Sequence, residues 1–160
     1  MLRTASISDA EQICRIYNHY ILTSVCTFEQ KPVEAAEMVN RINDTTKDFP
    51  WIVCEDNGII TGYAYAGKWK TRTAYDRTVE STVYIAKEYV GKGIGKLLYT
   101  ELIHILHRIS LHSIIGIIAL PNAASIALHE KIGFKKVAHL KEVGWKFDRW
   151  IDVGYWQLML

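Results

Sequence analysis

The sequence predicts an α+β (α/β) fold on a mixed sheet, because it combines a β-hairpin with a β-α-β unit. The hairpin is indicated by two apolar, β-branched and aromatic runs at residues 51–55 and 59–66. Asn57-Gly58 lies between them and is typical of tight two-residue turns, so the two strands are expected to be antiparallel.

The β-α-β unit starts with a strand at residues 78–85, in which side chains of opposite character alternate. A glycine-dense turn follows, then an amphipathic helix from Ile94 and a buried strand at residues 114–120. Because a helix joins the two strands, we expect them to be parallel. The buried face of the helix is expected to consist of Leu97, Leu98, Leu102, Ile105 and Leu106.

Two helices are expected before the hairpin. Ser8-x-x-Glu11 forms a capping box pattern ahead of apolar residues at helical spacing, which predicts a helix over residues 9–22. Pro32 suits the first turn of a second helix, which is expected to end at Asp44.

Three short elements are expected after residue 120. Pro121-Asn122 interrupts the chain, and a short helix at residues 123–132 should end at Gly133. Residues 134–138 and 153–160 then have the pattern of final strands.

Composition limits the class of protein. The chain has 160 residues, of which 49% are hydrophobic and 22% charged, so we expect one domain over residues 1–160. A formal net charge of +2 is too small to favour bulk nucleic-acid binding. No signal-peptide pattern and no run of 18 apolar residues is found, so we expect a cytoplasmic protein without membrane partners.

The cysteines and histidines indicate neither cross-links nor a metal site. Three widely spaced cysteines without a C-x-x-C pattern predict no disulfide framework and no zinc site. Cys26 and Cys54 are expected to be buried and inert, although as nucleophiles they would imply a ping-pong route. The six histidines lack H-E-x-x-H or comparable spacing, so no metal is expected.

The turn at residues 91–95 is the first candidate site. Gly91, Gly93 and Gly95 allow tight turning and close ligand approach, and the free N–H groups of the following helix favour an anion. The spacing fits neither a P-loop, which needs a Ser or Thr where Leu97 stands, nor a dinucleotide fingerprint. A pyrophosphate cradle of another type remains, with Glu80 on the strand that leads into it.

At these residues the chain resembles the GNAT acetyltransferase superfamily. The family's acetyl-CoA motif, Arg/Gln-x-x-Gly-x-Gly/Ala after a strand, is matched by Gly93-Ile94-Gly95, with Val90 replacing the Arg or Gln. The segments 65–84, 120–134, 143–146 and 150–157 resemble phosphinothricin and methionine sulfoximine N-acetyltransferases. The resemblance implies a GNAT fold with a mostly antiparallel sheet, helices on both faces and a parallel β-α-β unit. It also implies acetyl-CoA as co-substrate and a homodimer.

Two residues are candidates for catalysis. Glu80 is suited to take a proton from an amine beside the thioester, a role that the resemblance implies, whereas a solvent-facing strand carboxylate is the alternative. His129 stands where many GNAT enzymes carry a tyrosine that protonates the thiolate, and it is expected either to transfer a proton or to contact substrate. The alternative interpretation is a surface histidine on a short helix, with its hydrogen bonds satisfied and no role in catalysis.

The resemblance also assigns binding residues. The pantetheine arm is expected to pair with the backbone of Val83, Tyr84 and Ile85, and to contact Asn122 and Ser125. Asn122 can equally cap the following helix. The expected pyrophosphate cradle consists of Gly91, Lys92, Gly93, Ile94, Gly95 and Lys96. The expected acceptor site consists of Phe28, Lys70, Thr71, Arg72, Tyr75, Ser81 and Thr82.

Arg72 and Lys70 would bind the anionic groups of an amino-acid analogue, because a guanidinium matches two oxygens at once. The leading hypothesis is therefore direct acetyl transfer to the α-amine of a small amino-acid analogue such as phosphinothricin or methionine sulfoximine. Acetylation of a polyamine or a protein N-terminus is the second hypothesis. A non-catalytic acyl-CoA-binding or RNA-binding module is the third.

Overall fold

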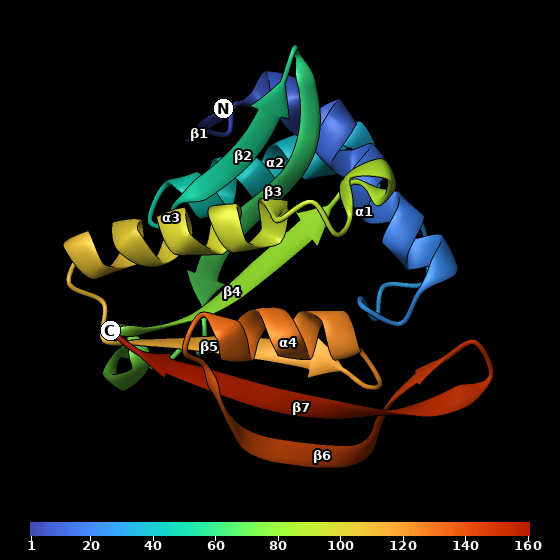
Figure 1. Cartoon of the computed structure of the whole chain (residues 1–160), viewed down its shortest axis with the longest axis vertical. Helices are drawn as coiled ribbons and strands as arrows, with labels where there is room; N and C mark the ends of the chain where they lie inside the picture. Colours follow the sequence, from blue (N-terminus) through green and yellow to red (C-terminus); the bar gives the residue numbers. More distant parts are fainter.

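A computed structural model describes all 160 residues, which form one seven-stranded sheet with helices on both faces (Figure 1). The strand order is β1-β2-β3-β4-β5-β7-β6. Every neighbouring pair is antiparallel except β4 and β5, which are parallel as predicted. None of the helices combines the length and the apolar character of a membrane span.

The strands and helices have the following bounds. The strands are β1 (Leu2–Thr4), β2 (Trp51–Asp56), β3 (Ile59–Lys68), β4 (Thr78–Ile85), β5 (Ser113–Ala119), β6 (Lys135–Lys146) and β7 (Arg149–Met159). The α-helices are α1 (Ala10–Thr23), α2 (Ala35–Thr46), α3 (Ile94–Arg108) and α4 (Ala123–Lys131). Short 3-10 turns lie at Ile7–Asp9, Thr73–Tyr75 and Lys87–Tyr89.

Alternation along the strands divides the core into two layers. Trp51, Val53 and Tyr63 pack with α1 and α2 on one face. Their neighbours Ile52 and Ala64 pack with α3 and the C-terminal strands on the other. Because successive strand residues point to opposite faces, each strand contributes to both layers.

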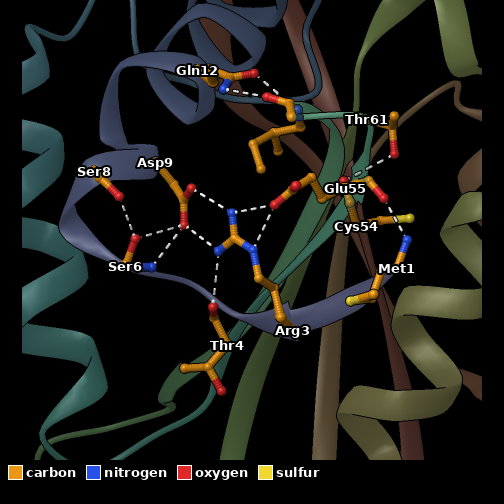
Figure 2. Close-up of polar contacts among 12 residues, drawn as sticks. Met1, Arg3, Thr4, Ser6, Ser8, Asp9, Gln12, Cys54, Glu55 and Thr61 are labelled. Atoms are coloured by element: carbon orange, nitrogen blue, oxygen red, sulfur yellow. Dashed lines mark hydrogen bonds and ion pairs between the residues drawn. The ribbon is translucent and has the colours of Figure 1, made fainter.

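The hairpin prediction is confirmed by the pairing of β2 with β3. Asn57 and Gly58 both have positive φ values, +48° and +81°, as a tight turn of this kind requires. Gln12 of α1 holds the turn in place, since its amide donates to the Gly58 carbonyl and accepts from the Ile60 N–H (Figure 2).

The first helix begins differently from the prediction. Ser6 and Asp9, rather than Ser8 and Glu11, form the capping box, in which the Ser6 N–H donates to the Asp9 carboxylate at 2.8 Å. Arg3 of β1 holds Asp9 in this position, because its guanidinium donates to both Asp9 carboxylate oxygens at 2.7 Å and also to Glu55 (Figure 2). The second helix starts at Ala35 rather than at Pro32.

Two predictions for the C-terminal half are also wrong. Leu97 is 50% exposed, and Tyr99 takes its place on the buried face of α3. The final strands are longer than expected, because β6 and β7 continue to a turn at Phe147 and Asp148, whose positive φ values reverse the chain. The polar and glycine residues between 139 and 152 concealed this extension, since most of β6 is an exposed edge strand.

Candidate functional site

The site is a groove between β4 and β5. The two strands pair only from Thr78↔Ser113 to Ser81↔Gly116 and then separate, as Figure 1 shows. The gap opens into a groove of about 1040 Å³. Its walls come from the C-terminal halves of both strands, the N-terminal end of α3, the length of α4, the C-terminal half of α1 and the segment that follows α1.

The backbone of β4 faces this groove at alternate residues. Ala86 N–H bonds to the Thr61 carbonyl, so the β3–β4 register directs the polar backbone groups of Tyr84 towards β3 and those of Val83 and Ile85 away from it. The Tyr20 hydroxyl already donates to the Ile85 carbonyl at 2.7 Å. Tyr84 therefore contributes its ring to the groove, and Val83 and Ile85 offer the backbone groups predicted to pair with a ligand.

The glycine turn forms an anion cradle at the start of α3. Gly91 and Gly93 have φ values of +81°, which side chains other than hydrogen rarely permit. Gly93 is the N-cap of α3, and the N–H groups of the next three residues have no hydrogen-bond partner in the chain. These three residues are Ile94, Gly95 and Lys96. Free N–H groups and the helix dipole together favour a phosphate here.

Two further details fit this cradle. A Cβ at Gly95 would lie 3.0 Å from Leu128 Cδ2, so the glycine lets α3 approach α4 closely. The Val90 side chain, which stands where the family has Arg or Gln, is 56% exposed, and Gly91 and Gly93 beside it have the positive φ values of the turn. The Lys92 ammonium lies 4.7 Å from the Tyr89 ring centre and does not line the groove.

Asn122 caps α4 and also lines the groove. Its side-chain oxygen accepts the Ser125 N–H at 3.1 Å, which confirms the capping interpretation. Its amide nitrogen lies 3.4 Å from the Cys26 sulfur. Cys26 is exposed and lines the groove, so the expectation that it is buried is wrong, whereas Cys54 is buried as expected.

A buried hydrogen-bond chain runs along the α3–α4 side of the groove. His129 Nδ1 lies 2.7 Å from the Ser125 carbonyl, which can only accept, so this nitrogen carries the proton. His129 Nε2 must then accept from the Tyr99 hydroxyl at 2.9 Å. The Ser81 hydroxyl lies 3.1 Å from the same Tyr99 oxygen.

Burial determines the protonation states of His129 and Tyr99 in this hydrogen-bond chain. His129 is only 3% exposed, and burial lowers the pKa of its imidazole, so the ring is neutral. Burial raises the pKa of Tyr99, which therefore keeps its proton. Gly116 makes room for the imidazole, since a Cβ there would lie 2.6 Å from two of its ring atoms.

Glu80 lies on the other side of β4. Ser81 contacts Tyr99 of α3, whereas Tyr84 packs against the α1–α2 layer, so alternation places Glu80 and Thr82 on the α1–α2 side. Glu80 is half-buried and forms no hydrogen bond or ion pair within the chain. Burial raises the pKa of its carboxyl, against the opposing charge of Lys70.

The predicted acceptor residues are only partly brought together. Phe28, Thr82 and Glu80 line the groove on the α1–α2 side. Ser81 lines it from the α3–α4 side, because the strand alternates, and so does not stand beside Glu80. The other predicted acceptor residues are exposed and lie outside the groove lining, namely Lys70, Thr71, Arg72 and Tyr75.

Several groove residues were not predicted from the sequence. Tyr17 of α1 contributes its ring, which meets that of Tyr84 edge-on at 5.2 Å. Tyr99 had a detectable signal, because it follows Leu98 on the face of an apolar helix where a hydroxyl needs a partner. Tyr17 and Tyr20 lie at helical spacing with the apolar residues of α1, but this spacing does not distinguish groove residues from core residues.

Comparison with known proteins places this geometry in a family. The model of the acetyltransferase (GNAT) domain matches residues 2–154. Phosphinothricin N-acetyltransferase of Streptomyces viridochromogenes is 40% identical over 156 residues, covering 98% of this chain and 85% of its own. The L-methionine sulfoximine/L-methionine sulfone acetyltransferase of Salmonella typhimurium is 35% identical over 160 residues, covering 99% and 94%.

A solved structure agrees with these sequence matches. A GNAT superfamily phosphinothricin acetyltransferase from Sinorhizobium meliloti, in complex with AcCoA, is 37% identical and superimposes with a TM-score of 0.97. The match covers 100% of this chain and 88% of that one. Sequence, fold and the open β4–β5 groove thus lead to one assignment: the chain belongs to the GNAT family of acetyltransferases and is an N-acetyltransferase similar to those that act on phosphinothricin and methionine sulfoximine.

Proposed function

We propose that the chain transfers the acetyl group of acetyl-CoA directly to the α-amine of a small amino-acid analogue of the phosphinothricin or methionine sulfoximine type. The observation that carries the proposal is that β4 separates two groups of functional residues within the groove. The anion cradle and the Ser81–Tyr99–His129 chain lie on the α3–α4 side, and Glu80 lies on the α1–α2 side. Both sides open into one groove, so two substrates can meet there.

The residues on the α3–α4 side fit acetyl-CoA. Its pyrophosphate would be held by the N–H groups of Ile94, Gly95 and Lys96, which lack partners in the chain. Its pantetheine amides would be held by the backbone of Val83 and Ile85, with Asn122 opposite them. When bound there, acetyl-CoA supplies an acetyl group activated as a thioester.

Glu80 is placed to prepare the acceptor amine. An α-amine is mostly protonated at neutral pH, and the carboxylate can accept its proton directly or through a water molecule. The raised pKa of Glu80, caused by burial, makes it a stronger base than an exposed glutamate. Its lack of any partner in the chain keeps both oxygens free for this proton.

Tyr99 and His129 are placed to return a proton to the leaving sulfur. His129 holds its only proton on Nδ1 against the Ser125 carbonyl, and its Nε2 lone pair accepts from Tyr99. The Tyr99 hydroxyl is therefore the proton donor of the pair: it gives its proton to the thiolate, and the resulting phenolate takes up a proton from water in the groove before the next turnover. His129 Nε2 orients the hydroxyl but holds no proton to supply. This extends the role expected for His129 alone.

Thiol release from acetyl-CoA tests the proposed function. The panel contains phosphinothricin, methionine sulfoximine, spermidine and a short peptide with a free amino terminus. We expect release with the first two and an N-acetyl product of matching mass. Preference for spermidine or the peptide would favour the second hypothesis. Binding of acetyl-CoA without release for any amine would favour a non-catalytic module and contradict the proposal.

A further inference from the structure

The segment between α1 and α2 forms the acceptor-side wall of the groove. Val25, Cys26, Thr27 and Phe28 all line the groove. None of them belongs to a helix or strand, so the position of this wall depends on side-chain contacts and not on a backbone ladder.

The C-terminal hairpin holds this wall in place by several contacts. Val25 packs with Ala119 and Ile151 in a small buried cluster. The Phe28 ring lies directly over Gly144, where a Cβ would be only 2.2 Å from its Cζ atom. The hairpin therefore supports the groove wall through these contacts, although no residue of the hairpin tip lines the groove itself.

Lys146 provides the polar part of this connection. It is the last residue of β6 and is 3% exposed. Its ammonium donates to the Thr27 carbonyl at 2.8 Å and lies 5.0 Å from the Phe147 ring centre, but it forms no ion pair. On the other side of the wall, the Thr27 hydroxyl is bound to the Tyr17 hydroxyl at 2.8 Å.

A buried ammonium with one carbonyl partner is a poor choice for stability alone. Removing an ammonium from water is costly, and a well-packed apolar side chain of similar length serves packing better. Burial lowers the pKa of Lys146, which shows the same cost. The gain from this lysine must then lie in where it places the Thr27 backbone.

We propose that Lys146 is a positioning residue for the acceptor amine, because its bond to the Thr27 carbonyl fixes the 25–28 segment as the acceptor-side wall. This inference rests on the proposed function for its kinetic part only. Loss of the bond is expected to loosen the wall, to weaken acceptor binding and to leave the cradle on the α3–α4 side unaffected.

The test compares Lys146→Met with Lys135→Met. Methionine keeps most of the apolar stem and removes the ammonium, and Lys135 is an exposed lysine on the same strand without a hydrogen bond in the chain. We expect Lys146→Met to raise the KM for the acceptor about tenfold while the KM for acetyl-CoA stays within about twofold. The temperature of unfolding should not fall, and Lys135→Met should match the wild type.

Labelling of Cys26 by Ellman's reagent supplies a measurement that needs no turnover. Cys14 and Cys54 are buried, so Cys26 is the thiol that reacts in the folded protein, and a Cys26→Ser variant verifies this. We expect Lys146→Met to label several-fold faster than Lys135→Met. Gly144→Ala, which displaces the Phe28 ring, should accelerate labelling by a different route.

The outcomes separate this inference from the proposed function. Equal labelling rates in the two lysine variants would overturn it, as would an unchanged acceptor KM. Parallel losses for both substrates, together with a lower unfolding temperature, would show a general structural role and would also overturn it. If the wild type acetylates no amine, the proposed function fails, and the labelling rates alone decide whether Lys146 holds the wall.

Discussion

Replacing Glu80 with glutamine removes the proposed base while changing little else. The Glu80 carboxylate forms no hydrogen bond or ion pair in the chain, so the isosteric amide breaks no contact. It also removes a half-buried charge, whose desolvation raises the pKa of the carboxyl. We therefore expect the free energy of unfolding to stay within about 0.5 kcal/mol of the wild type or to rise.

The expected kinetic effect is much larger. A positioned base contributes about 10²–10⁴-fold in rate, which corresponds to about 2.7–5.5 kcal/mol of transition-state stabilisation. Glu80→Gln should lose that factor in kcat, with little change in the KM for acetyl-CoA. The acidic limb of the pH–rate profile should disappear as well, because in the wild type activity falls as pH drops through the raised pKa of Glu80.

The assay is thiol release at saturating acetyl-CoA, combined with thermal unfolding of the same samples. Glu101→Gln is a matched control, because Glu101 is also half-buried and has no hydrogen-bond partner in the chain, but it lies on α3 outside the groove. Retention of wild-type kcat and of the acidic limb in Glu80→Gln would refute the base role. A large loss of stability would show that Glu80 holds the fold instead.

Three further changes test other parts of the structure. Gly93→Val should weaken acetyl-CoA binding at least about tenfold in calorimetry, because valine resists the φ of +81° that aims the cradle, and unaltered affinity would contradict the cradle. Tyr99→Phe should lower kcat more than the KM for either substrate, because it leaves His129 Nε2 without its donor, and an unchanged kcat would remove Tyr99 from proton transfer. Asp9→Asn should lower the free energy of unfolding at pH 7 by about 1–3 kcal/mol, since it disrupts the grip of Arg3. Arg3 lowers the pKa of Asp9, so the stability that the Asp9 carboxylate contributes is present above about pH 4 and is lost as the pH falls through the pKa of Asp9 in the folded protein. Denaturant unfolding should therefore show that the free energy of unfolding falls less steeply with acidification in the variant than in the wild type.

Elements with strong local signals were predictable from the sequence. The Asn57-Gly58 turn and the strand–turn–helix around Gly93 depend on short-range geometry, and both appear at the expected residues. The start of α1 was misplaced because Ser8-x-x-Glu11 and Ser6-x-x-Asp9 are equally good local patterns. Arg3, from another part of the chain, selects the second pattern, and local spacing does not contain that contact.

The candidate site shows the same limit. Alternation along β4 is evident in the sequence, but which side of the strand faces α3 depends on tertiary packing. The sequence therefore assigns Ser81 to the acceptor site, although its side chain faces α3, on the opposite side of β4 from Glu80. The Ser81–Tyr99–His129 chain joins three elements far apart in sequence, and only the fold brings its hydroxyls and imidazole within hydrogen-bonding distance. The exposed position of Arg72 was equally hidden, because a cationic loop has no periodicity from which its direction can be inferred.

Initial rates with both substrates varied test most directly whether acetyl-CoA and the acceptor meet across β4. Direct transfer requires both to be bound together, so we expect intersecting lines in double-reciprocal plots of phosphinothricin against acetyl-CoA, and no CoA release without an acceptor. Parallel lines, with an acetyl group found on Cys26 by intact-protein mass spectrometry, would show a covalent ping-pong route and contradict direct transfer.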